Sequence, residues 1–136
     1  MPFGVVDGVD FIHTGLVRKV DSVSIKLSLD SNKIVLLSPL GFSPTGQAFN
    51  LSFEDVAVST AAALKADKIV FLTPYSGLHD EAGDLITELS LAQMQEYITS
   101  HPEIPAGMKT LLNLSGKAIK AGVGRVHFLP CNRDGA

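Results

Sequence analysis

Side chains that could bind a metal ion gather in one short segment, residues 75–84. It carries His79, Asp80, Glu81 and Asp84. Carboxylate oxygens and imidazole nitrogens are common metal ligands, but a metal site needs them spaced on an element that aims them at one point. These side chains crowd a glycine-containing polar segment instead. The sequence therefore favours a solvated loop and predicts no metal site.

Two further reactive side chains lie near the end of the chain. His127 falls inside an apolar run, and Cys131 follows it by four residues. A single histidine in an apolar strand is most often a hydrogen-bonded core residue. No Ser–His–Asp, Cys–His or zinc-type arrangement can be assembled, so no catalytic residue is predicted. Cys131 is the single cysteine, which excludes an internal disulfide and fits a reducing compartment.

Three short apolar runs predict the strands that would position these residues: 33–38, 68–73 and 125–130. Unbroken apolar runs of this length suit strands that are buried on both faces, as in a parallel sheet. Parallel strands need crossovers, and helical patterns lie between the runs. The predicted fold class is therefore α/β.

Three segments carry those helical patterns: residues 53–65, a helix that begins after Ser90, and residues 108–120. Ser52 and Ser90 are expected to cap the first two, because Asp55 and Gln93 follow them by three residues as in a capping box. Gly122 is expected to end the third helix.

Hairpins are predicted at two glycine-containing turns. Thr14 and Gly15 separate residues 10–13 from 16–20, and residues 43–46 separate 40–42 from 47–49. Between them, residues 22–29 alternate polar and apolar side chains, a pattern that by itself indicates a strand.

Composition limits the classes of protein to be considered. The chain has 136 residues, 46% of them hydrophobic and 18% charged, which suits one folded domain with a core. The 11 Lys and Arg are scattered and the net charge is −3, so a nucleic-acid binder is disfavoured. No apolar run is long enough to cross a membrane and no secretory signal opens the chain, so the expected location is the cytoplasm.

Several motifs occur in a characteristic order. Residues 38–51 run into Glu54-Asp55, and residues 64–73 and 122–127 follow. Together they resemble the amino acid kinase family, in the branch that contains acetylglutamate kinases and N-acetylglutamate synthases. Residues 7–15 and 134–136 are similar to the bacterial synthases. The resemblance covers essentially the whole chain, and motifs that agree in order are far more specific than one alone.

The resemblance implies a three-layer sandwich around a mainly parallel sheet with β-hairpins, of the amino acid kinase or carbamate kinase-like type. Residues 1–136 would form the second half of that domain, with the upstream half and a downstream acetyltransferase domain absent. It also favours a helix at residues 22–29, which we adopt. A sheet that lacks neighbours has an unpaired edge, so we expect a homo-oligomer or self-association.

The same resemblance assigns substrate-side roles to Asn50 and Glu54. Asn50 matches an asparagine that holds the amino-acid substrate, and an amide suits the backbone-like atoms of an acylated amino acid. Without the resemblance, a turn into the helix capped by Ser52 is favoured for Asn50. Glu54 stands where the kinases have an aspartate that organises lysines. A first-turn carboxylate favoured by the helix dipole is an equally open interpretation.

A degenerate nucleotide-type loop is implied at Thr73 and Gly77. Family kinases have an aspartate after the threonine, where this chain has Pro74. The family's phosphate-facing lysine is replaced by Leu111, and Lys109 lies about 200° away from it around a helix. Both departures argue against kinase activity, because phosphoryl transfer depends on positioned cations.

His127 matches a histidine near the arginine inhibitor of arginine-sensitive relatives. The resemblance thus implies L-arginine as effector, beside glutamate or N-acetylglutamate as a partner. The parent would be an amino-acid N-acetyltransferase of arginine biosynthesis, with acetyl-CoA used in the absent domain and no cofactor in this chain. Alternatives are an acetylglutamate kinase-like phosphotransferase and a non-catalytic small-molecule-binding module.

Overall fold

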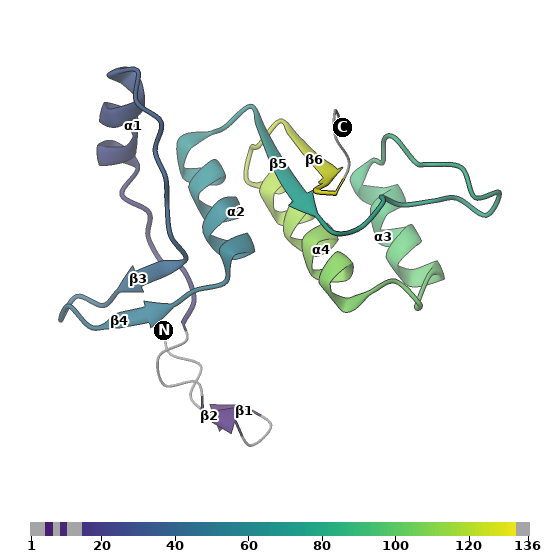
Figure 1. The fold of residues 1–136 in the computed structure, drawn as a ribbon, viewed down its shortest axis with the longest axis horizontal. Helices are drawn as coiled ribbons and strands as arrows, with labels where there is room; N and C mark the ends of the chain where they lie inside the picture. The colour runs from purple at the N-terminus through teal and green to yellow at the C-terminus, as the bar shows by residue number, and fades with distance from the viewer. Residues whose placement is uncertain (1–4, 7–8, 11–14, 133–136) are drawn as a thin grey trace. The chain divides into compact units, whose positions relative to one another are not determined.

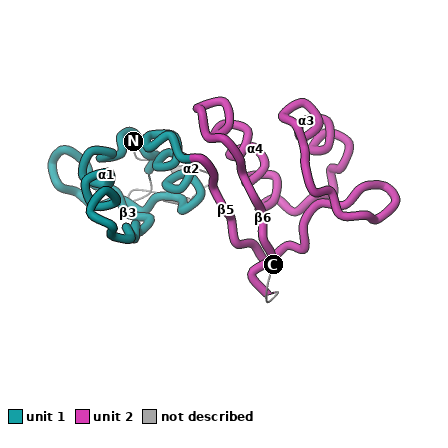
Figure 2. Tube along the Cα trace, turned by 90° about the horizontal axis from the view of Figure 1, so that it is seen from above, with its two compact units in different colours: residues 1–66 teal, residues 67–136 magenta. Residues whose placement is uncertain are grey.

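The computed structural model describes residues 5–6, 9–10 and 15–132, and the chain divides into two units, residues 1–66 and 67–136 (Figure 2). The first unit contains β1 (Val5–Val6), β2 (Val9–Asp10), α1 (Ser22–Asp30), β3 (Leu40–Phe42), β4 (Ala48–Asn50) and α2 (Phe53–Leu64). The second contains β5 (Lys68–Thr73), α3 (Leu91–Ser100), α4 (Ala106–Lys120) and β6 (Arg125–Pro130) (Figure 1).

The β3–β4 hairpin confirms one of the two predicted hairpins. Its strands are antiparallel, with Leu40 opposite Asn50 and Phe42 opposite Ala48. The amide of Gly46 donates to the carbonyl of Ser43 at 2.9 Å, and Gly46 has a φ of 84°. That left-handed conformation is open to glycine without steric cost, which is why the turn ends at this residue.

Helix α1 settles the ambiguous segment in favour of the helix that the resemblance implied. Asp21 caps it, with its carboxylate accepting from the amide and the hydroxyl of Ser24. Helix α2 is also confirmed, and the Ser52 hydroxyl accepts from the Asp55 amide at 3.1 Å. A full capping box would also need a bond from the Ser52 amide to the Asp55 side chain, and the described residues show no such bond.

The other expected hairpin, at residues 10–20, is wrong in the part that the structure describes. Residues 16–20 form no strand, and residues 11–14 lie outside the described residues. The Gly15 amide instead donates to the carbonyl of Asn50. Upstream, β1 and β2 form a short antiparallel pair.

The expected strand at residues 33–38 is also wrong. This run has no strand assignment, and the side chains of Ile34 and Leu36 are 98% and 95% exposed. A strand requires a neighbour that accepts and donates backbone hydrogen bonds. Within the described residues, no strand pairs with this run.

The parallel pair β5–β6 confirms the other two predicted strands. Ile69 lies opposite Val126, and Phe71 opposite Phe128, whose rings stack with centroids 5.8 Å apart. Phe128 also packs against the core cluster of Met94, Met108 and Leu112, which α3 and α4 supply. The opposite face leaves Leu72 69% exposed. Burial on both faces was therefore a wrong expectation for this unit.

Helices α3 and α4 form as predicted. Ser90 caps α3 in a full capping box with Gln93. The buried face of α4 consists of Met108, Leu111, Leu112, Leu114, Ser115, Gly116 and Ala118. Gly122, with a φ of 102°, ends that helix. Gly124 then allows a close crossing, because a Cβ there would lie 2.6 Å from the carbonyl oxygen of Asp67.

The described part of the chain is thus a mixed α/β structure with two-stranded sheets. The complete three-layer sandwich that the resemblance led us to expect is not present in the described residues. None of the described helices is both long enough and apolar enough to cross a membrane.

Candidate functional site

Asn50 and Glu54 lie on one short junction in the first unit, where β4 ends and α2 begins. The side chain of Asn50 is exposed, and its carbonyl accepts from Gly15 at 2.9 Å. Glu54 is half-buried, and its Oε2 accepts a 2.7 Å hydrogen bond from the hydroxyl of Ser52. The same hydroxyl accepts from Asp55 N–H, so Glu54 is tied to the capped start of α2. The junction thus carries an exposed amide and, four residues later, a carboxylate that is bonded to Ser52.

Thr73 closes β5 in the second unit and is 2% exposed. Its hydroxyl donates to the carbonyl of Tyr75 and accepts from the Tyr75 amide, each at 3.3 Å. The carbonyl of Thr73 accepts from Cys131 at 2.8 Å. Thr73 therefore shapes the turn at the carboxyl ends of β5 and β6, the edge at which open α/β sheets bind ligands.

Gly77 lies on the loop that follows. Its φ of 109° is a left-handed conformation, and a Cβ there would lie 2.6 Å from Cδ1 of Leu85. The positive φ favours glycine at this position, whereas the exposed Leu85 side chain could move aside. The loop continues into a hairpin-like strap, residues 78–86, in which the Ile86 amide donates to the carbonyl of Leu78 at 2.8 Å.

Asp80 organises the tip of that strap. Its Oδ1 accepts from the amides of Ala82 and Asp84, both at 2.9 Å. In the described residues, no group of three or more His, Cys, Asp or Glu is placed to hold a metal ion. The side chain of Asp80 thus stabilises the turn, and those of His79, Glu81 and Asp84 are exposed.

A cavity of about 690 Å³ opens between this loop, α3 and the start of α4. Tyr97 and His101 stack on its α3 side with ring centroids 4.1 Å apart, and the Tyr97 hydroxyl donates to the carbonyl of His79 at 2.8 Å. Its charged lining among the described residues is Asp80, Glu81 and Glu103, with no Lys or Arg. Such a lining disfavours polyphosphate, because nothing positive compensates the phosphate charge.

Leu111 and Lys109 occupy different environments on α4. Leu111 is 6% exposed and belongs to the core. The ammonium of Lys109 donates to the carbonyl of Pro102 at 3.0 Å, which caps the preceding turn. Neither side chain supplies a free cation to the cavity. The structure therefore agrees with the departure from the kinase pattern at these two positions.

His127 is exposed on β6, opposite Val70 in the parallel register. The expectation of a core histidine from the residues alone is therefore wrong. Because side chains alternate along a strand, Val126 and Phe128 turn toward the helices and His127 turns to the other face. An exposed imidazole is available to a ligand, as an effector role would require.

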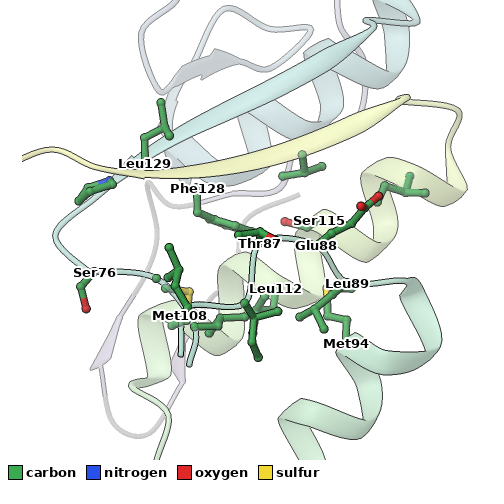
Figure 3. Close-up of a pocket in the computed structure, with 17 residues that line it drawn as sticks. Ser76, Thr87, Glu88, Leu89, Met94, Met108, Leu112, Ser115, Phe128 and Leu129 are labelled. Carbon is green, nitrogen blue, oxygen red and sulfur yellow. The ribbon is translucent and has the colours of Figure 1, made fainter. Parts of the chain in front are cut away.

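Sequence reasoning overlooked the aromatic wall of the 690 Å³ cavity. Tyr97 lies on α3 and His101 follows directly after the helix, and their spacing of four residues was the available signal. It also overlooked a second cavity of about 630 Å³ beside the Met94, Met108 and Leu112 cluster (Figure 3).

A family model for the amino acid kinase family matches residues 3–130. The chain belongs to the amino acid kinase family. It is 53% identical over 135 residues to an amino-acid acetyltransferase of Ralstonia nicotianae, and 45% identical over 135 residues to that of Ectopseudomonas mendocina. These alignments cover 99% of this chain but only 30% and 31% of the relatives, respectively.

Two solved structures of the N-acetylglutamate synthase of Neisseria gonorrhoeae are similar to this chain. One contains coenzyme A and L-arginine, with a TM-score of 0.87 at 34% identity. The other contains coenzyme A and N-acetyl-glutamate, with a TM-score of 0.86 at 36% identity. Each match covers 99% of this family member and 31% of the synthase chain. The amino acid kinase domain seen here is therefore homologous to that of N-acetylglutamate synthases.

Proposed function

We propose that this chain serves an N-acetylglutamate synthase as its arginine-sensing and scaffolding segment. The single observation that carries the proposal is the match over 99% of the chain to a synthase structure that contains L-arginine. At 34% identity and a TM-score of 0.87, the likeness extends beyond the general fold. The corresponding protein would move the acetyl group of acetyl-CoA to the amino nitrogen of glutamate and release the thiol of CoA, in the cytoplasm.

The acetyl transfer is proposed to take place outside residues 1–136. In this proposal, these residues are the second half of an amino acid kinase domain, whose three-layer sandwich needs strands beyond the pairs described here. No catalytic residue and no cofactor is assigned to them. Their contribution would be an effector site, the amino-acid side of a binding surface, and contacts between copies.

The proposed residue roles follow from chemistry and placement. His127 would contact arginine, since its imidazole is exposed on β6. Asn50 and Glu54 would face glutamate or N-acetylglutamate. The exposed amide can both donate and accept, and the carboxylate is already held by Ser52. Thr73 and Gly77 would retain the shape of a nucleotide loop without its charge.

A kinase role is the less favoured alternative. Leu111 is buried and the ammonium of Lys109 is bonded to Pro102, so neither position offers a free cation to a transferring phosphate. The acidic lining of the cavity beside Gly77 argues in the same direction. The third alternative is a stand-alone module that binds a small molecule without catalysis and serves no acetyltransferase.

The test is calorimetric titration of residues 1–136 with L-arginine, N-acetylglutamate and ATP–magnesium. We expect saturable heat with arginine that is lost in His127→Ala and kept in His79→Ala, a matched change of an exposed histidine on the strap. Absence of arginine binding, or equal loss in both variants, would refute the sensor role. Tight binding of ATP–magnesium would instead restore the kinase alternative.

A further inference from the structure

The 630 Å³ cavity of the second unit has four walls built by separate elements. Met94 comes from α3, and Met108, Leu112 and Ile119 come from α4. Residues 76–78 and 85–89, which include both ends of the strap, and the end of β6 form the other walls. In Figure 3, Phe128 points from β6 into this space, while Leu129 points to the other side of the strand.

The cavity is partly open to solvent, because Leu85, Thr87 and Glu88 on its lining are exposed. Ligand pockets typically measure roughly 300–1,000 Å³ and are mostly apolar, with a few polar groups. A cavity of about 630 Å³ lined by methionine, leucine and phenylalanine side chains falls in that class.

The outer wall is held in place by contacts that need no ligand. The Tyr97 hydroxyl binds the carbonyl of His79, and Asp80 fixes the tip of the strap. Leu85 packs against Gly77, where a side chain would collide with it. The space is therefore preformed, which lowers the entropic cost of binding. Met94 and Met108 add adaptable surfaces, because their unbranched thioethers adjust to the shape of a ligand.

Charge decides the ligand class. Among the described residues, Glu88 is the only charged side chain that lines the cavity, and it has no ion-pair partner there. Ser115 is 2% exposed and already donates to the carbonyl of Leu111, so it is not a free donor for a carboxylate. Thr87 and Ser76 also line the cavity and are exposed. Apolar walls with one free carboxylate complement an apolar body that carries one cationic group.

We propose that this cavity is a binding site for small amphipathic amines, with the apolar body against Met94, Met108 and Phe128 and the ammonium at Glu88. The site is separate from His127, which lies on the opposite face of β6 from Phe128. It is independent of the proposed arginine-sensing role. Its ligand differs in class from a nucleotide, because the lining offers no cation.

The experiment uses the whole chain with ¹³C-methyl-labelled methionine. Two of its three methionines, Met94 and Met108, line the cavity and report occupancy by NMR. The probes are 2-phenylethylamine, as the cation, and 3-phenylpropionate, an anion with a similar body. We expect saturable shifts of both methyl signals, with the cation bound more tightly by up to about fivefold, the ratio that one exposed charge pair can supply.

Three variants make the outcome decisive. Glu88→Gln should abolish the preference for the cation, whereas Glu96→Gln, an exposed carboxylate of α3 outside the cavity, should preserve it. Ile119→Phe should reduce binding of both probes by filling the space. Absence of methionine shifts, equal affinity for both probes, or unchanged binding in Ile119→Phe would overturn the proposal. Unchanged binding in Ile119→Phe would mean that the probes adsorb non-specifically. Equal affinity for both probes would mean that Glu88 does not select the ligand.

Discussion

Individual side chains in this protein stabilise the N-termini of their own helices through hydrogen bonds. At α2, the Ser52 hydroxyl accepts from the Asp55 amide and donates to Glu54. At α1, the Asp21 carboxylate accepts from the Ser24 amide. Such contacts follow from sequence spacing, because a cap and its partner are three residues apart. The exposure of His127 could not be read in this way. His127 lies in an apolar run, and the run alone does not show which of its residues face the helices. That is decided only by the pairing of β6 with β5.

Asp21 should make α1 sensitive to acid. The hydrogen bond from the Ser24 hydroxyl, and then that from the Ser24 amide, hold the pKa of Asp21 below its ordinary value. A lowered folded pKa means that the stabilisation is complete above the unfolded pKa, about 3.9, and is lost as pH falls through the folded value. We expect the Ser24 amide NMR signal to titrate with a midpoint below about 3.9.

The matched control for this prediction is Asp21→Asn, which keeps an acceptor oxygen but has no proton to lose. Its Ser24 amide signal should not move in the same pH range. A midpoint at or above the ordinary aspartate value, or an identical titration in Asp21→Asn, would contradict the assignment of the cap.

Elements differ in how completely the sequence specifies them. Helices α3 and α4 were predictable because their apolar faces and caps lie within one turn of each other in sequence. The strands at 68–73 and 125–130 were found from the same kind of apolar run as 33–38, which forms no strand. The difference lies in strand pairing. The backbone groups of β5 and β6 form hydrogen bonds with each other, whereas a strand without a neighbour leaves its backbone groups unbonded.

The capping box of α3 should be the element's most sensitive surface contact. The Ser90 hydroxyl accepts from the Gln93 amide, and Gln93 Oε1 accepts from the Ser90 amide at 2.9 Å. Ser90→Ala removes the first bond and weakens the pair, so we expect a loss of about 1 kcal/mol in the free energy of unfolding. Urea unfolding followed by circular dichroism measures this change.

Ser100→Ala is the control for Ser90→Ala. The Ser100 hydroxyl donates to the carbonyl of Glu96 in the last turn of α3, where the site is exposed. Its loss should cost less than about 0.5 kcal/mol. Equal effects of both variants would show that the box does not stabilise α3 more than an ordinary surface hydroxyl.

At the scale of the molecule, the protein presents apolar surface that its own described elements do not cover. Ile34 and Leu36 are almost fully exposed, and Leu72 is 69% exposed on the open face of β5–β6. The chain spans 30% of the length of the Ralstonia relative that it matches. Exposed apolar side chains beside unpaired backbone favour association.

Self-association should therefore respond to the run at 33–38. We expect the protein to sediment above monomer mass at rising concentration, and the double change Ile34→Lys with Leu36→Lys to shift it toward the monomer. Val23→Lys, a similar change of a 68% exposed side chain on α1, should have a smaller effect. A single monomer boundary for the unchanged protein over a wide concentration range would refute the expectation.

The sequence by itself determined helices α2, α3 and α4, the caps Ser52 and Ser90, the β3–β4 turn and the strands of the β5–β6 pair. It also carried the resemblance to the amino acid kinase family, and only that resemblance implied α1. These depend on contacts between near neighbours or on motifs in order. Only the tertiary structure decided that 33–38 pairs with no strand of the described residues, that His127 is exposed, and that Met94, Met108 and Glu88 line one cavity. Each of those outcomes depends on residues far apart in the chain, whose pairing and packing no local pattern encodes.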